Sequence, residues 1–68
     1  MKLSARNQFK GKVVEIKEGA VNASVKIEIA EDVVISSTIS MEAVKELGLT
    51  VGAEATAVIK ATSVMVMA

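Results

Sequence analysis

Two short segments near the ends of the sequence concentrate groups that donate hydrogen bonds. The segment Ser4–Gln8 supplies a hydroxyl, a guanidinium and two amides, and the segment Lys60–Ser63 supplies an ammonium and two hydroxyls. Neither segment contains a carboxylate. A doubly charged tetrahedral oxyanion requires many N–H and O–H donors, at least one fixed positive charge and no competing carboxylate. The two segments together therefore predict a site for such an anion.

Ser40 is a further candidate, because it precedes a short helical pattern. A serine at a helix start offers a hydroxyl beside backbone N–H groups that have no partner inside the helix. Ser40 taken alone is more typical of an ordinary N-cap. Lys2, Lys10 and Lys12 are interpreted as solvated surface residues, as most lysines are. Arg6 and Lys60 are interpreted as functional, because of the donors that surround them.

The charge of the chain is unevenly distributed, although the formal net charge is zero. The first twelve residues hold four cations and no acid, the eight acids all lie between residues 13 and 59, and Lys60 has no acid after it. The cations of the first twelve residues are Lys2, Arg6, Lys10 and Lys12. In a five-stranded barrel the first and last strands can lie close together. Arg6 and Lys60 are then expected to face one small anion, within one subunit or across an interface.

The apolar pattern indicates which elements position these groups. Alternating or β-branched runs predict strands at residues 7–17, 21–29, 33–39, 54–61 and 63–67. Between the third and fourth strands, Val44 and Leu47 predict one short helix, with Gly48 suited to the position after its C-terminus. This order is typical of an all-β, five-stranded, OB-like Greek-key barrel with one short helix, which forms a single domain over residues 1–68.

Two strands of this pattern carry further information. In the first, the apolar phase switches between Val13 and Val14, which predicts a β-bulge or a sharply coiled strand. In the last, residues 64–67 read Val-Met-Val-Met and leave no polar face. Such a strand must be covered on both sides, by the core or by a neighbouring subunit.

Length and composition exclude several classes of function. A chain of 68 residues buries only roughly 60% of its unfolded surface, so a mean hydropathy of +0.49 favours a homo-oligomer over a monomer. The absence of Cys and His removes disulfides, thiolate metal sites and the usual neutral-pH general base. The scattered acids predict no site for a bare metal cation. Without a signal-peptide or membrane-spanning run, a cytoplasmic protein with no membrane partner is expected.

Three segments resemble the molbindins, the small molybdate-binding proteins of bacteria. They read SARNQFKG at residues 4–11, ISMEAV at 39–44 and AVIKATSV at 57–64. The resemblance covers essentially the whole chain. It implies an OB-like barrel assembled into a hexamer, a trimer of dimers, that holds molybdate or tungstate at subunit interfaces. It further implies intracellular storage of the oxyanion for molybdenum homeostasis, and neither catalysis nor a catalytic cofactor.

The resemblance also implies which residues bind the oxyanion. In chain order they are Ser4, Arg6, Asn7, Ser40, Lys60, Ala61 and Thr62, with Ala61 acting through its backbone. A second class of oxyanion site is expected where backbone N–H groups of a turn are exposed. This turn comprises Gly19, Ala20, Val21 and Asn22.

Other classes of function remain as alternatives. One is an OB-fold module that binds nucleic acid, which the single aromatic residue, Phe9, and the zero net charge disfavour. Another is an assembly domain that binds no oxyanion. An enzyme is disfavoured because no nucleophile is paired with a base in the sequence. We therefore expect the protein to bind a small oxyanion and no nucleic acid.

Overall fold

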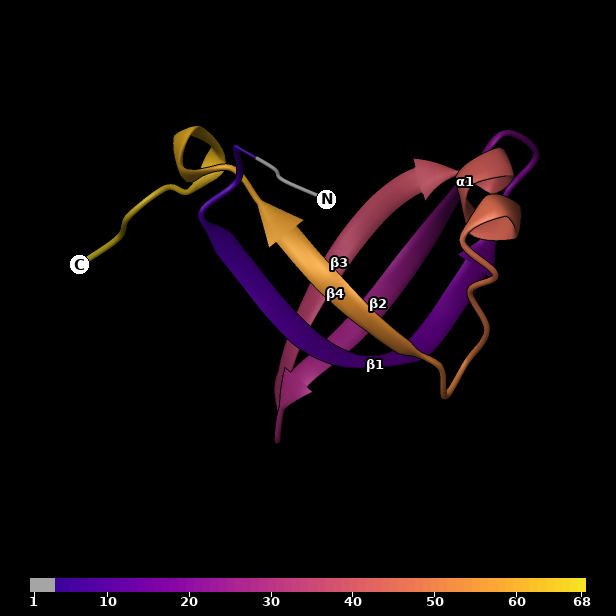
Figure 1. The fold of residues 1–68 in the computed structure, drawn as a ribbon, viewed down its shortest axis with the longest axis horizontal. Helices are drawn as coiled ribbons and strands as arrows, with labels where there is room; N and C mark the ends of the chain where they lie inside the picture. The colour runs from indigo at the N-terminus through magenta and orange to yellow at the C-terminus, as the bar shows by residue number, and fades with distance from the viewer. Residues whose placement is uncertain (1–3) are drawn as a thin grey trace.

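A computed structural model describes residues 4–68 as a curled antiparallel sheet with one short helix (Figure 1). The strand order across the sheet is β3-β2-β1-β4. Its elements are β1 (Asn7–Glu18), β2 (Asn22–Ala30), β3 (Val33–Ser40), α1 (Met41–Glu46), β4 (Glu54–Ile59) and a 3-10 helix, η1 (Ala61–Ser63). Lys2, one of the N-terminal cations, lies outside the described residues. Neither helix in residues 4–68 is long and apolar enough to cross a membrane.

Strand β1 organises the sheet, because it pairs with a different neighbour along each half. Its first half, from Asn7 to Lys12, pairs with β4, and its second half, from Lys12 to Glu18, pairs with β2. The register against β2 shifts between Val13 and Glu15, which confirms the predicted irregularity at Val14. The bulge increases the twist of the strand and so helps to curl the sheet.

Gly11 allows β1 to cross β2 closely where the sheet curls. A Cβ atom built at this position would overlap the carbonyl oxygen of Glu28 in β2. The overlapping atom belongs to the backbone, so no side-chain rotation can relieve it. The close crossing therefore requires glycine.

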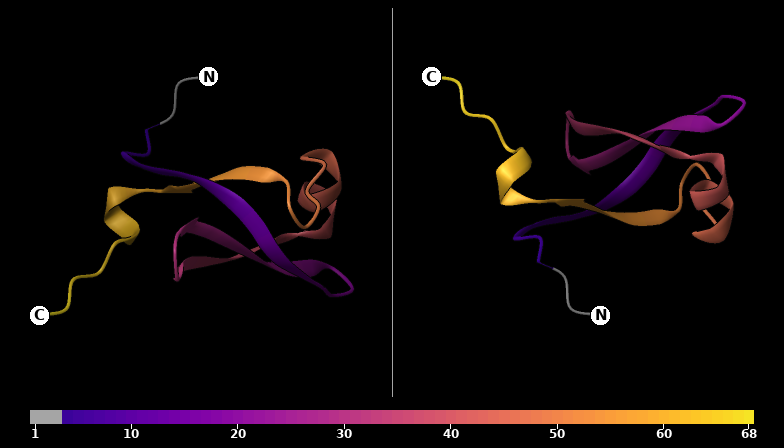
Figure 2. Two further views of the ribbon diagram at one scale, coloured as in Figure 1. Left: turned by 90° about the horizontal axis from the view of Figure 1, so that it is seen from below. Right: turned by 90° about the horizontal axis from the view of Figure 1, so that it is seen from above.

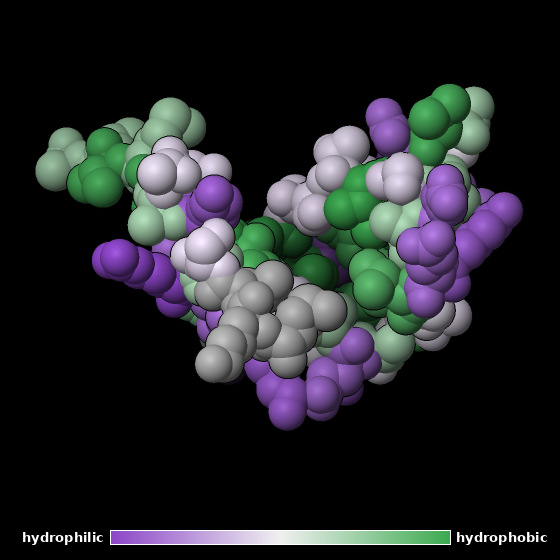
Figure 3. Space-filling view, turned by 45° about the horizontal axis from the view of Figure 1, so that its top comes forward, coloured by the Kyte–Doolittle hydropathy of each residue, from purple (hydrophilic) through white to green (hydrophobic). Residues whose placement is uncertain are grey.

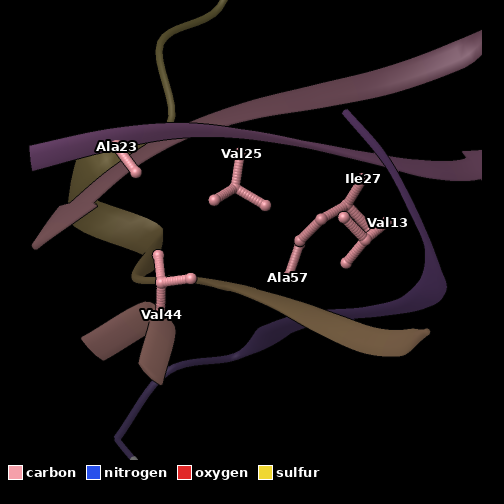
Figure 4. Packing of buried hydrophobic residues seen from close by; sticks show 6 residues of the cluster. All are labelled: Val13, Ala23, Val25, Ile27, Val44 and Ala57. Atoms are coloured by element: carbon pink, nitrogen blue, oxygen red, sulfur yellow. The ribbon is translucent and has the colours of Figure 1, made fainter. Parts of the chain in front are cut away.

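A small core fills the concave side of the sheet (Figure 4). The alternation predicted for the second strand is confirmed at Ala23, Val25 and Ile27, which are all buried. Val21 precedes the strand and is 72% exposed, contrary to the pattern that included it. The buried cluster comprises Val13, Ala23, Val25, Ile27, Val44 and Ala57. The core is thus built almost wholly from small and β-branched side chains.

The short helix α1 begins and ends as the sequence predicts. The Oγ of Ser40 accepts a hydrogen bond of 3.0 Å from the backbone N–H of Ala43, which makes Ser40 the N-cap. Gly48 has a φ of 64°, a left-handed conformation suited to the position after the helix. Val44 packs into the core, whereas Leu47 at the C-cap is 68% exposed.

The prediction of a fifth strand is wrong for the single chain. Residues 64–68 form no strand, and the sheet stays open between its edge strands β3 and β4. A strand forms only where its backbone groups find a partner edge, and the terminal segment leads away from both edges (Figures 1 and 2). The expected cover for Val64–Met67 is therefore not supplied by the core of the same chain. The closed OB-like barrel and the hexamer remain predictions.

Candidate functional site

The β1–β4 ladder brings the two cationic segments to the same end of the molecule. Its outermost pair is Asn7 with Ile59, and the Nδ2 of Asn7 donates a hydrogen bond of 3.2 Å to the carbonyl oxygen of Ile59. The residues that follow the ladder outward are Arg6 and Lys60. Figures 1 and 2 both show the chain before β1 beside the chain after β4. The two cationic segments thus lie side by side within one chain, and their joint contact with one anion stays a prediction.

Arg6 and Lys60 have no carboxylate partner in the part of the chain that the structure describes. The ion pairs found there join Lys10 to Glu54 at 3.4 Å and Lys26 to Glu15 at 3.5 Å. Arg6 and Lys60 are both exposed. Two cations on neighbouring segments, without a counter-ion among residues 4–68, create a local positive potential that attracts an anion. Lys10, by contrast, is partly neutralised by Glu54, which agrees with its interpretation as a surface residue.

The helix η1 adds backbone donors directly after Lys60. Within this turn, the N–H of Ser63 donates to the carbonyl of Lys60 at 2.8 Å, and the N–H of Val64 donates to Ala61 at 3.2 Å. The first N–H groups of a helix have no partner inside it, and no side chain caps this one. The N–H groups of Ala61 and Thr62 therefore have no partner inside the helix, and the backbone contribution expected of Ala61 stays a prediction.

The segment before β1 is held in place by contacts that the sequence did not indicate. Ala5 is 9% exposed and anchors the segment between the exposed residues Ser4 and Arg6. The Nε2 of Gln8 donates to the carbonyl oxygen of Ala5 at 3.3 Å. Asn7 likewise donates one amide hydrogen to the carbonyl oxygen of Ile59 in β4. Gln8 and Asn7 thus position the segment, and the bond to Ile59 uses only one of the two amide hydrogens of Asn7. Burial of an alanine between polar residues has no local sequence signal.

The structure places Ser40 apart from Arg6 and Lys60. Ser40 pairs with Asn22 in the β2–β3 register, and the N–H of Met41 donates to the carbonyl of Val21 at 2.7 Å. Both contacts lie at the α1 end, whereas the cationic segments lie at the opposite end of the fold (Figure 1). Within one subunit, Ser40 is therefore adjacent to the turn predicted as a second site.

In the turn Gly19–Asn22, some backbone groups already take part in hydrogen bonds within the chain. Gly19, Ala20, Val21 and Asn22 are all exposed. The N–H of Gly19, however, donates to the carbonyl oxygen of Asn22 at 2.9 Å, which closes the turn. The backbone carbonyl of Val21 is also occupied, by Met41. Neither of these two hydrogen bonds uses the N–H group of Ala20 or Val21.

Comparison with known proteins gives consistent matches along the chain. The model of the TOBE domain family matches residues 3–66. A probable molybdenum-pterin-binding protein of Haemophilus influenzae is 67% identical over 97% of this chain and 96% of its own length. A molybdate-binding protein from Sporomusa ovata has a similar structure, with a TM-score of 0.93 and 32% identity over 100% of both chains.

A third relative has been solved with its ligand. The cytoplasmic molybdate-binding protein ModG, in a form with molybdate bound, matches with a TM-score of 0.86 and 51% identity. The match covers 90% of this chain and 43% of the ModG chain. The fold and the sequence agree, and they confirm the resemblance drawn from the three motifs. This chain therefore belongs to the TOBE domain family and, within it, to the molybdenum-pterin-binding proteins, the molbindins.

Proposed function

We propose that this protein binds molybdate, and tungstate in the same manner, between the subunits of a homo-oligomer and so stores the oxyanion in the cytoplasm. The observation that carries the proposal is that Arg6 and Lys60 directly follow the Asn7–Ile59 pair on neighbouring segments, and that neither has a carboxylate partner among residues 4–68. Two relatives support the choice of anion: the protein from Sporomusa ovata and the protein ModG both bind molybdate.

The chemistry of the site fits an anion that only accepts hydrogen bonds. Molybdate is a dianion near neutral pH, so it offers four acceptor oxygens and no proton. The guanidinium of Arg6 pairs with two oxygens, and Lys60 provides a second positive charge. The hydroxyls of Ser4 and Thr62 and the N–H of Ala61 complete the donors. Hydrogen phosphate carries a proton that would face these donors, and sulfate is smaller, so both bind less well.

A second subunit completes this site with Ser40. The N-cap interaction uses a lone pair of the Ser40 hydroxyl and leaves its O–H hydrogen to donate. Because Ser40 lies at the other end of its own chain, it reaches an anion at Arg6 and Lys60 only from a neighbouring copy. In the hexamer that we propose, a trimer of dimers, each anion then bridges chains and stabilises the assembly by mass action. The turn Gly19–Asn22 forms the second class of site.

Native mass spectrometry with added molybdate tests the proposal, because it reports the number of subunits and of ligands together. We expect an oligomer that gains molybdate in discrete steps and gains tungstate equally. Isothermal titration with sulfate and with hydrogen phosphate serves as the control, and both should bind more weakly. Failure of the oligomer to take up molybdate, or equal affinity for hydrogen phosphate, would contradict the proposal.

The alternatives of a nucleic-acid module and of a ligand-free assembly domain are tested in parallel. Base stacking in nucleic-acid-binding barrels uses several aromatic rings. Phe9 is the single aromatic residue of the sequence and is 39% exposed. We therefore expect no shift of single-stranded oligonucleotides on a native gel. A ligand-free assembly domain would show the oligomer in the mass spectrum without any bound oxyanion.

A further inference from the structure

The hollow side of the sheet is unsuited to an oxyanion, so the position of the anion depends on the two cationic segments. Hydrophobic residues gather in this hollow (Figure 3), which includes an apolar groove of about 550 Å³ between β3 and β4. Glu54 is the only charged residue in the lining of the groove, and its carboxylate repels an anion. Burial of a charge without partners is costly. The geometry of the proposed site is therefore set by the contacts that hold Arg6 and Lys60 on their neighbouring segments.

Side-chain hydrogen bonds hold the chain on both sides of Arg6. The Nε2 of Gln8 donates to the carbonyl oxygen of Ala5 at 3.3 Å, and the Nδ2 of Asn7 donates to the carbonyl oxygen of Ile59 at 3.2 Å. The one other side-chain hydrogen bond found within residues 4–68 caps α1. The backbone before and after Arg6 is thus fixed, although its side chain is exposed.

The two hydrogen bonds restrain different movements. Asn7 joins β1 to β4 at the last pair of the ladder and so limits the separation of the two segments. Gln8 reaches back three positions and holds the segment before β1 against the start of the strand. Ala5 is 9% exposed, so its side chain is a second anchor for this segment. No backbone hydrogen bond within residues 4–68 holds residues 4–6, and the bond from Gln8 therefore carries much of their order.

We propose that Gln8 is a positioning residue that fixes Arg6 relative to Lys60 and thereby gives the site its preference for molybdate over the smaller sulfate. The inference rests on the proposed function and names the residue that sets its selectivity. Gln8 acts through the backbone of Ala5, to which its amide is bound. Donors that are held in place before the ligand arrives bind it with little further loss of conformational freedom.

Selectivity between these two anions must come from size. Sulfate and molybdate have the same charge and the same tetrahedral shape, so charge alone does not separate them. A restrained segment keeps Arg6 at the spacing that suits the larger anion and does not follow a smaller one inward. A released segment must be ordered on binding either anion, but it also closes around sulfate. Loss of the Gln8 bond should therefore weaken molybdate binding and reduce the preference for it.

Substitution of Gln8 by methionine tests this role, because methionine keeps a long unbranched side chain and lacks the amide. We expect Gln8→Met to raise the Kd for molybdate about tenfold in isothermal titration calorimetry and to leave the Kd for sulfate within twofold. Thr38→Met is the matched control. Thr38 is an exposed, uncharged strand residue that makes no side-chain hydrogen bond within residues 4–68 and does not line the groove. Both Kd values should stay within twofold in this control.

A second variant gives the same test with a different side chain. Gln8→Glu keeps the shape of glutamine, but its carboxylate cannot donate to the carbonyl oxygen of Ala5. The added negative charge weakens both anions alike, so the ratio of the two Kd values is the quantity to compare. We expect this ratio to move toward one, as in Gln8→Met.

A double-mutant cycle shows whether Gln8 acts through Arg6. If it does, Gln8→Met should change the Kd for molybdate by less than twofold in the Arg6→Ala background, against about tenfold in the wild type. A general loss of stability would persist in both backgrounds, and urea unfolding without ligand measures it separately. An equal effect in both backgrounds would overturn the proposal.

Titration of the wild type with both anions separates this inference from the proposed function. A wild-type protein that does not bind molybdate would defeat the proposed function and the inference together. A wild-type preference for molybdate that folded Gln8→Met retains in full would sustain the proposed function and overturn the role of Gln8.

Discussion

Replacement of Arg6 by alanine tests the arrangement of the cationic segments most directly. The exposed guanidinium of Arg6 takes part in no ion pair among the described residues, so its loss should change the free energy of unfolding by less than about 0.5 kcal/mol. Its fork can donate two charge-assisted hydrogen bonds to the anion. At about 1.5 kcal/mol each, the low end for such bonds, their loss weakens binding by about 3 kcal/mol.

The expected change is roughly a 100-fold increase in the Kd for molybdate, measured by isothermal titration calorimetry. Arg6→Lys should lose less, because it retains the charge but not the planar fork. Lys10→Ala is the matched control. Lys10 pairs with Glu54 at 3.4 Å and both side chains are more than 70% exposed, so we expect less than a twofold change in Kd.

Circular dichroism of each variant establishes that the fold is retained. Equal losses of affinity for Arg6→Ala and Lys10→Ala would show that the protein attracts the anion by general charge alone. Wild-type affinity in a folded Arg6→Ala variant would remove Arg6 from the site.

Three predictions concern the elements that position the site, and each is measured by urea or thermal unfolding without ligand. Gly11→Ala forces a Cβ against the backbone of Glu28 and should cost about 3 kcal/mol; a loss below 1 kcal/mol would argue against the close crossing. Ser40→Ala removes the N-cap bond to Ala43 and should cost about 1 kcal/mol, whereas Ser40→Asp should retain most of it. Val13→Ala empties space around a side chain that is 0% exposed and should cost about 2 kcal/mol, and an unchanged midpoint would contradict the assigned core.

Much of the fold is predictable from the sequence, because local patterns encode which face of an element is buried. The alternation around Val25 sets the buried face of β2, and the phase switch at Val14 marks the bulge in β1. Ser40 and Gly48 mark the two ends of α1 through well-understood backbone chemistry. The fifth strand was predicted wrongly for the single chain, since the pattern at Val64–Met67 indicates only that the segment requires cover.

The candidate site was predictable in its chemistry but only partly in its geometry. The donors and the absence of carboxylates at Arg6 and Lys60 are properties of residue type. Their proximity depends on the β1–β4 register, which joins Asn7 to Ile59 across 52 positions of sequence. Ser40 lies at the α1 end of the molecule, away from Arg6 and Lys60. Its residue type did not predict this position, because an N-cap serine has the same local sequence pattern wherever its helix packs on the sheet.

The amino-acid sequence by itself determined the alternation that makes strands, the caps of the short helix and the donor-rich, acid-free composition of both chain ends. Tertiary structure alone decided which ends meet, that Gln8 and the buried Ala5 brace the binding segment, and that an apolar groove stays open between β3 and β4. The physical reason is the sequence distance between the residues that interact. Burial and capping act over a few neighbouring residues, whereas strand order and edge exposure result from pairings between distant segments that no local pattern specifies.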